Sequence, residues 1–252
     1  MRIGIICYPT FGGSGVVATE LGIELSKRGH HVHFMAYKKP VRLDTDLERI
    51  HFHEVHVPDY PLFHYQPYEL ALSSALVDMV RLHKIELLHA HYAIPHAYAA
   101  FMAKQMLAEL QINIPIVTTL HGSDITLVGS HPFYKPAVTF SINNSDVVTS
   151  VSKSLKHDTK DIFTINREID VVPNFIDIQK YERLRNTCSR EQLVKPDERL
   201  ITHVSNFRPV KRVQDVLSVF SKVNKKVKSR LILAGDGPER QLAEEYTKEL
   251  GL

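Results

Sequence analysis

The stretch that decides the fold is residues 3–21, IGIICYPTFGGSGVVATEL. It begins with an apolar run of the kind that forms a buried strand in a parallel sheet. Its end predicts a helix that carries Val17, Leu21 and Leu25 on one face. We expect this helix to end at Gly29, because glycine adopts the left-handed conformation of a helix C-terminus without steric cost. The stretch therefore predicts a strand–turn–helix unit of an α/β fold.

Three glycines, Gly12, Gly13 and Gly15, occupy the turn between this strand and this helix. Glycine lets a ligand come close to the backbone. The helix start behind the turn presents free N–H groups and about half a positive charge. This combination predicts a place for a phosphate, a carboxylate or a sugar hydroxyl. A tightly packed turn without a ligand is the alternative interpretation.

The pattern of the first stretch is repeated along the chain. Apolar runs of strand length alternate with segments of helical periodicity, which predicts βαβ units in a mostly parallel, doubly wound sheet. Further strands are expected at residues 31–37, 50–57, 85–91, 114–120, 146–151 and 170–172, and helices at residues 68–84, 97–110, 134–144 and 152–163. Ser152 is expected to cap the last of these helices. Residues 1–172 are therefore predicted to form a Rossmann-like N-terminal domain.

The rest of the chain is organised differently. Its periodicity is lost in a polar segment, which predicts an interdomain linker over residues 173–198. The α/β pattern restarts at residues 199–252, with strands expected at residues 200–204 and 230–234 and helices at residues 213–223 and 239–250. A domain of this length has too few strands to cover its own core. We therefore expect the sequence to be the N-terminal part of a longer protein, with an incomplete second domain.

The composition excludes several classes of protein. The 252 residues are 44% apolar and 23% charged, which is typical of a soluble globular protein with a real core. The net charge is only +3, so neither nucleic acid nor a membrane is indicated as a partner. Two cysteines, Cys7 and Cys188, make no disulfide framework. With no leader and no membrane-length apolar run, we expect a cytoplasmic protein.

Fifteen histidines raise the question of a metal. The most suggestive groups are His51 and His53, followed by His56, and His89 with His91. Alternate residues of a strand share a face, so His51 and His53 are expected to point into solvent together. No HExxH motif and no zinc-finger spacing accompany these groups. We therefore expect no bound metal.

Ligands of doubly wound sheets bind outside the carboxyl ends of the strands. The polar residues expected there are the Gly12–Gly15 loop, His91, Tyr92, Thr119, His121, Gly122, Ser123, Asp124, Asn174 and Phe175, and in the second domain Ser205, Asn206, Arg208 and Lys211. We expect Arg208 and Lys211 to face the first domain across a cleft, where two cations would neutralise a leaving diphosphate. A solvated loop before a helix is the alternative interpretation of this pair.

Residues 13–18, GSGVVA, also fit the dinucleotide fingerprint G-x-G-x-x-A. An NAD(P)-dependent oxidoreductase therefore remains an alternative. Against it, the turn from Cys7 to Gly13 is longer than the tight turn of the fingerprint, and the second strand ends in Lys38 and Lys39 instead of an acid. The two lysines would suit the 2′-phosphate of NADP. A non-catalytic module that binds a sugar or nucleotide is a third hypothesis.

With these residues in order, the sequence resembles the retaining glycosyltransferases of the GT-B fold in glycosyltransferase family 4, which includes sucrose-phosphate and mycothiol-type synthases. The matching motifs are the glycine loop, His121-Gly122-x-Asp124, Val172-x-Asn174-Phe175-Ile176-Asp177, Lys211 at a helix start and Gly235-Asp236-Gly237-Pro238. Residues 7–22 and 91–97 more narrowly resemble the branch of the family in bacillithiol biosynthesis, which transfers N-acetylglucosamine from UDP to the hydroxyl of L-malate.

The resemblance implies a role for each matching residue. It gives His121, Arg208 and Lys211 catalytic roles: His121 beside the anomeric region of the sugar, and the two cations on the diphosphate of the leaving UDP. It gives substrate-binding roles to Gly12, Gly13, Ser14, Gly15, Tyr92, Thr119, Asp124, Asn174 and Asn206. Among these, Ser14 is expected to bond a malate carboxylate and Asp124 to fix its own loop. Tyr92 and Thr119 are candidate contacts to the acceptor.

Two departures from the family pattern stand out. The family pattern Gly-Arg-x-x-x-x-Lys is replaced by residues 205–211, SNFRPVK, with Asn206 at the position of the arginine and Arg208 two residues later. The Glu-x7-Glu element that grips the sugar and ribose is expected beyond Leu252, so this fragment is expected to be inactive or nearly so. The implied partners are UDP-N-acetylglucosamine as donor substrate and L-malate, with no cofactor and no metal. A homodimer is compatible with the sequence.

Overall fold

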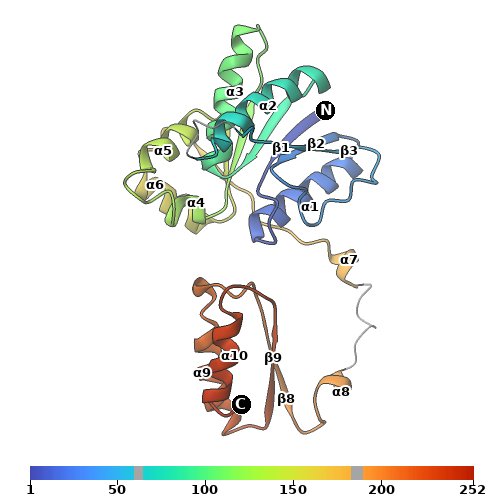
Figure 1. Ribbon diagram of the computed structural model, residues 1–252, viewed down its shortest axis with the longest axis vertical. Helices are drawn as coiled ribbons and strands as arrows, with labels where there is room; N and C mark the ends of the chain where they lie inside the picture. Colours follow the sequence, from blue (N-terminus) through green and yellow to red (C-terminus); the bar gives the residue numbers. More distant parts are fainter. Residues whose placement is uncertain (60–64, 183–189) are drawn as a thin grey trace. The chain divides into compact units, whose positions relative to one another are not determined.

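The computed structural model describes residues 1–59, 65–182 and 190–252, so that Cys188 lies outside the described residues. The chain divides into two compact units, Met1–Phe175 and Ile176–Leu252 (Figure 1). Each unit is built from parallel strands joined through helices. The two units are described separately below.

The first unit is a seven-stranded, fully parallel sheet in the order β3-β2-β1-β4-β5-β6-β7. Its strands are β1 (Arg2–Ile6), β2 (His31–Ala36), β3 (Ile50–Glu54), β4 (Leu87–His91), β5 (Ile116–Leu120), β6 (Val147–Ser150) and β7 (Ile169–Val171). The predicted doubly wound sheet is confirmed. The strand order reverses between β1 and β4, and such a switch point opens a crevice at the carboxyl ends of the two strands.

The helices of the first unit are α1 (Gly13–Lys27), α2 (Tyr68–His83), the irregular turn η1 (Ala93–Ala97), α3 (Tyr98–Glu109), α4 (Ser123–Thr126), α5 (Lys135–Asn143) and α6 (Lys153–Ile162). Ser152 caps α6 as predicted, its hydroxyl accepting from the backbone N–H of Leu155. The short α4 was not predicted, because a single turn after His121 and Gly122 has no helical periodicity to detect.

Helices cover both faces of this sheet (Figure 1). Ile5 and Phe34 belong to the core beneath α1, while Ile6 and Met35 belong to the core beneath α2 and α3. Strands covered on both sides carry continuous apolar runs instead of alternation. The apolar start of the first stretch therefore reflects its central place in the sheet.

The helix predicted after the glycine turn is confirmed, but small residues make its contact with the sheet. Val17, Leu21 and Leu25 are only half-buried, and the fully buried positions are Ser14, Gly15, Ala18, Thr19, Gly22 and Ser26. The reason is a close approach to the sheet: a Cβ added to Gly22 would lie 2.2 Å from Cζ of Phe34. Small side chains occupy the contact, and the larger ones flank it.

The expectation that His53 points into solvent is wrong. Its ring is half-buried, and its Nε2 atom lies 2.9 Å from Nδ1 of the buried His33 on the neighbouring strand β2. His51 does share this face, with its ring centroid 4.5 Å from that of His33. Helix α2 lies over the sheet here, because the ring of its last residue, His83, lies 4.6 Å from that of His53.

The second unit contains two parallel strands, β8 (Arg199–Val204) and β9 (Ser229–Ala234). Its helices are α7 (Ile178–Glu182), α8 (Arg190–Leu193), the short turn η2 (Pro209–Lys211), α9 (Val213–Asn224) and α10 (Arg240–Glu249). Phe207, Val213, Leu217 and Ala243 form its buried core. The helices α7 and α8 lie within residues 173–198, which the sequence analysis interpreted as a linker.

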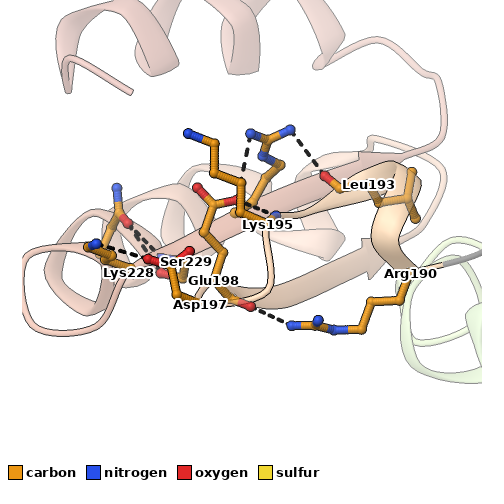
Figure 2. A network of polar contacts seen from close by, with 9 residues as sticks. Arg190, Leu193, Lys195, Asp197, Glu198, Lys228 and Ser229 are labelled. Atoms are coloured by element: carbon orange, nitrogen blue, oxygen red, sulfur yellow. Dashed lines mark hydrogen bonds and ion pairs between the residues drawn. The ribbon is translucent and has the colours of Figure 1, made fainter.

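A polar network joins α8 to the beginnings of β8 and β9 (Figure 2). The guanidinium of Arg190 donates to the carbonyl of Glu198, and Arg230 donates to the carbonyl of Leu193 over 3.0 Å. Lys228 pairs with Asp197 at 2.9 Å. The first two contacts hold α8 in place, and the third joins the residues that precede β8 and β9. All of them lie at the amino ends of the strands.

Within the described residues, no helix combines the length and the apolar character needed to cross a membrane.

Candidate functional site

The glycine loop lies between β1 and α1, next to the switch point of the sheet. A Cβ on Gly15 would lie 2.4 Å from the carbonyl oxygen of Tyr8 and 2.8 Å from that of Thr10, so the protein's own backbone requires this glycine. A Cβ on Gly13, in contrast, would meet nothing within 4 Å. The loop thus has one glycine that closes the turn and one that leaves open space above the backbone.

The start of α1 is not neutralised by the protein. Gly12 is its N-cap without a side-chain hydrogen bond, and the first turn holds no acidic residue. Ser14 in this turn is only 9% exposed. Uncompensated N–H groups at the start of a 15-residue helix attract anions. That the loop binds an anion stays a prediction.

Tyr92 follows β4 in a strained backbone conformation, with φ 93° and ψ 137°. A non-glycine residue in such a region costs of the order of 1–3 kcal/mol and persists only where its surroundings hold it. Its N–H donates to the carbonyl of Thr119 at 3.0 Å, and its hydroxyl lies 2.7 Å from Oγ of Ser123. Strain that is held in this way is found at functional sites.

Asp124 holds the loop after β5 through three backbone N–H groups. Its Oδ1 accepts from His121 at 3.1 Å and from Gly122 at 2.9 Å, and its Oδ2 accepts from Ala93 at 3.2 Å. Burial raises the pKa of this carboxyl to about 6, and these hydrogen bonds oppose the rise. The geometry is that of an anchor that joins the loop after β5 to the turn after β4.

His121 pairs with His91, whose Nδ1 lies 2.9 Å from Nε2 of His121. Burial lowers the pKa of His121 to about 4 and holds that of His91 well below its usual value, so both rings are neutral at pH 7. Nε2 of His91 is buried without a partner in the described part of the chain. Burying an acceptor nitrogen without a partner costs less free energy than burying an N–H without one. The favoured arrangement therefore has the proton on Nδ1 of His91, which donates it to Nε2 of His121. The Nδ1–H of His121 is then available to a substrate.

The structure places the hydroxyl of Thr119 between strands, and its contact with the acceptor stays a prediction. Thr119 is 8% exposed, and its hydroxyl lies 2.7 Å from Nε2 of His89 and 2.8 Å from the hydroxyl of Thr149. The side chain therefore joins three strands. His89 in turn stacks on His91, with ring centroids 4.5 Å apart. Sequence reasoning missed this supporting role of His89 and His91, although their alternate spacing on one strand placed them on one face.

A cavity of about 950 Å³ adjoins these residues and was not predicted. Tyr8, Tyr92 and Asp124 line it together with Glu54 and Glu69, and the described residues of its lining include no lysine or arginine. The hydroxyl of Tyr68, which also lines the cavity, is buried without a partner among the described residues. Such a pocket suits an uncharged, hydroxyl-bearing group and disfavours an anion.

In the second unit, Arg208 and Lys211 lie on the exposed loop between β8 and α9. Asn206 on the same loop is half-buried, and its carbonyl accepts from the N–H of Arg208 at 2.8 Å. Within residues 1–59, 65–182 and 190–252, neither cation has a carboxylate partner, whereas the adjacent Arg212 pairs with Asp215. Two uncompensated cations on one loop are available to an anion.

This cationic loop is braced by the turn after β9. The N–H of Phe207 donates to the carbonyl of Asp236 at 2.9 Å, and the N–H of Glu239 donates to the carbonyl of Phe207 at 3.0 Å. Asn174, at the exposed end of the first unit, follows β7. That Arg208 and Lys211 meet the glycine loop across a cleft stays a prediction.

Two Rossmann-like units with polar residues at the carboxyl ends of their strands define the GT-B class of glycosyltransferases, and solved structures agree. The sucrose-phosphate synthase of Thermosynechococcus elongatus matches all of this chain and 68% of its own, with a TM-score of 0.73 and 14% identity. Anabaena Alr3699/HepE in complex with UDP-glucose matches all of this chain and 64% of its own, with a TM-score of 0.71 and 17% identity. At these identities the likeness shows the fold.

Sequence comparisons identify the family. The profile described as Glycosyltransferase Family 4 matches residues 11–180, and the profile described as Glycosyl transferases group 1 matches residues 185–252. The chain belongs to Glycosyltransferase Family 4.

Two curated relatives are similar over much of the chain. It is 48% identical over 240 residues to the N-acetyl-alpha-D-glucosaminyl L-malate synthase of Bacillus anthracis, covering 95% of this chain and 62% of that protein. It is 26% identical over 183 residues to the putative teichuronic acid biosynthesis glycosyltransferase TuaC of Bacillus subtilis, covering 69% of this chain and 44% of that one. The chain thus spans less than two thirds of the length of either relative.

Proposed function

We propose that the protein transfers N-acetylglucosamine from UDP-N-acetylglucosamine to the hydroxyl of L-malate with retention of configuration. The 48% identity to the malate synthase of Bacillus anthracis supports these substrates. The structural observation that carries the proposal is the neutral His91–His121 pair beside the anchored Asp124, at the carboxyl ends of β4 and β5. This arrangement offers an imidazole N–H where a sugar ring would react.

In the proposed reaction, the malate hydroxyl attacks the anomeric carbon from the face that UDP leaves. The new bond joins the anomeric carbon to the malate oxygen, the bond to the phosphate oxygen breaks, and the departing phosphate takes the proton. His121 donates its Nδ1–H to the sugar. Arg208 and Lys211 neutralise the charge that develops on the diphosphate, because charge-assisted hydrogen bonds strengthen as that charge grows. Asn206 and Asn174 are proposed as further substrate contacts.

We place the malate carboxylate at the start of α1 instead of in the cavity. The helix start is electropositive and uncapped, with Ser14 in its first turn and open space above Gly13. The cavity is lined by Glu54, Glu69 and Asp124 and would repel a dicarboxylate. The same loop is proposed to close over the donor diphosphate.

The proposal is tested by assaying the complete natural protein for malate-dependent release of UDP from UDP-N-acetylglucosamine. We expect release with malate and a loss of about 10²–10³-fold in kcat for H121Q. Its amide can still accept from His91 at the position of Nε2, but it has no N–H at the position of Nδ1. The exposed His157 provides a control, H157Q, that is expected to keep full activity. UDP release with another acceptor but none with malate would reject the acceptor. Residues 1–252 alone are proposed to release little UDP.

Ligand binding distinguishes the glycosyltransferase from the alternative, an NADP-dependent oxidoreductase. UDP is expected to raise the melting temperature of the chain, and NADPH is expected to leave it unchanged. The opposite result would favour the dinucleotide fingerprint of residues 13–18. UDP binding without any turnover by the complete protein would favour a non-catalytic binding module. The cytoplasmic location and a homodimer stay predictions.

A further inference from the structure

A second group of histidines lies apart from the proposed glycosyl-transfer site. His33 on β2, His53 on β3 and His83 at the end of α2 bring one nitrogen each within 4.8 Å of one another. Tyr68 and Glu69, which line the cavity, lie at the opposite end of α2. His83 is fifteen positions further along α2 than Tyr68, a rise of about 22 Å. His53 is closer to the cavity, because Glu54 and Val55, which follow it, line the cavity. None of the three histidines is itself among the residues that line the cavity.

The geometry of the group is that of converging ligands. Nδ1 of His33 and Nε2 of His53 are 2.9 Å apart, and the ring of His83 lies 4.9 Å from that of His33 and 4.6 Å from that of His53. Nitrogens on a tetrahedral zinc ion, with Zn–N bonds of about 2.0 Å, lie about 3.3 Å apart. Small rotations of His53 and His83 would suffice to place all three nitrogens on one ion.

The chemical surroundings of the three histidines suit a metal cation as a common partner of their nitrogens. No carboxylate pairs with any of the three rings in the described part of the chain, and their nearest titratable neighbours are His31 and His51. His33 is 5% exposed and its Nδ1 is within hydrogen-bond distance of Nε2 of His53, so a bound ion would replace the proton that these two nitrogens share.

We propose that His33, His53 and His83 bind a zinc ion that joins β2, β3 and the end of α2, a site independent of glycosyl transfer. Three imidazoles without a hard oxygen ligand suit Zn²⁺ and exclude Mg²⁺ and Ca²⁺ as the occupant. His53 and His83 are half-exposed, which leaves a path for the ion and a fourth position for water. This proposal replaces the expectation of no metal that the sequence spacing suggested.

The test uses the untagged protein, stripped with a chelator, and Zn²⁺ titrated against a chromogenic competitor. We expect one high-affinity ion per chain and a rise in melting temperature on adding Zn²⁺, with no rise on adding Mg²⁺. Loss of a residue that only hydrogen-bonds to a metal ligand weakens metal binding by roughly 10–100-fold. H83Q and H53Q each remove a ligand, so they should weaken Zn²⁺ binding by more than this and abolish the rise in melting temperature. Co²⁺ should give the visible absorption of a tetrahedral site in the wild type and lose it in H83Q and H53Q.

A matched control separates a defined site from a histidine-rich surface. H31Q removes an exposed histidine of the same strand, two residues from His33, and is expected to bind Zn²⁺ as the wild type does. All variants are compared in chelator, where equal melting temperatures show that they fold. Equal affinity of H83Q and the wild type, or no binding by the folded wild type, would overturn the proposal. A loss in H31Q equal to that in H83Q would also overturn it, because the ion would then have no defined ligand set.

Discussion

The loop between β1 and α1 and the loop between β8 and α9 follow the same strand–loop–helix plan, and the anion sites that we propose on them differ in kind. In the first unit the strand is buried, and the loop offers backbone N–H groups without a single cation. In the second unit the strand is half-exposed, and the loop carries Arg208 and Lys211. The first solution depends on shape and the second on charge. Substitutions, salt and pH should therefore act on the two loops differently.

The largest effect on stability and activity is expected from a substitution in the loop between β1 and α1, where backbone shape matters most. G15A forces a Cβ to within 2.4 Å of the carbonyl oxygen of Tyr8. Because a backbone carbonyl cannot move aside as a side chain can, we expect the free energy of unfolding to fall by about 3 kcal/mol and transferase activity to be lost. Urea unfolding and the UDP-release assay measure the two effects.

The matched control is G13A, whose Cβ meets nothing within 4 Å. We expect its stability to change by no more than about 0.5 kcal/mol, while malate binds more weakly because the methyl group occupies the open space. Equal destabilisation by G13A and G15A would show that the loop is a packed turn without a ligand.

The next largest effect on activity is expected from substitutions in the loop between β8 and α9, where charge matters most. R208Q and K211Q should each lower kcat by about 10²-fold, because each removes a cation from the leaving diphosphate. The activity of the wild type should fall with added KCl, since exposed charges are screened within about 10 Å at 0.1 M salt. The variants should lose part of this salt dependence.

Arg212 is the matched control for these two cations. It follows Lys211 directly but pairs with Asp215, so R212Q is expected to keep activity near that of the wild type. If R212Q lost as much activity as K211Q, general positive charge on the loop would matter instead of the two unpaired cations.

A smaller effect is expected from the anchor in the first unit. D124N keeps one acceptor oxygen but replaces the other with an amino group, which cannot accept from the N–H of Ala93. We expect a loss of about 1–3 kcal/mol in unfolding free energy. Because His121 is then misplaced, kcat should fall more than KM rises. A normal kcat in D124N would show that the loop after β5 holds its position without this carboxylate.

Acid should destabilise the first unit before the second. The histidines whose pKa is lowered to about 4 or below are His33, His53, His89, His96 and His121. The unfolded chain binds their protons near pH 6.5 and the folded chain does not. The stability that depends on them is therefore present above pH 6.5 and is lost as the pH falls towards 4. The loss is up to about 1.4 kcal/mol per pH unit for a fully buried ring such as His96, and less for the half-exposed His53, which solvent screens.

Asp124 acts in the opposite direction. Its folded pKa of about 6 lies above the usual 3.8, so its contribution is present below pH 3.8 and is lost as the pH rises through 6. The effect of this one carboxyl on the unfolding free energy is smaller than the combined effect of the five histidines. Hydrogen exchange in chelator at pH 7 and pH 5 should show protection lost in β1, β2 and β4 before β8 and β9. Equal loss of protection in both units would contradict the assignment of acid sensitivity to the buried histidines.

Local pattern alone was enough to predict most of the secondary structure. The strand–helix alternation predicted the parallel sheet, because covered strands and amphipathic helices have different periods. Ser152 was recognisable as a cap because its hydrogen bond to Leu155 spans only three residues. The glycine loop was recognisable in the same way, as was the family to which the chain belongs.

Only the tertiary structure decided which side chains meet between strands that are distant in sequence. His91 and His121 meet because β4 and β5 are neighbours, and the same pairing turns the hydroxyl of Thr119 inward. His33 and His53 meet through the register of β2 and β3. The physical reason is that side-chain direction follows from the local period, whereas the identity of the neighbour follows from strand order and register, which depend on burial summed over the whole sheet.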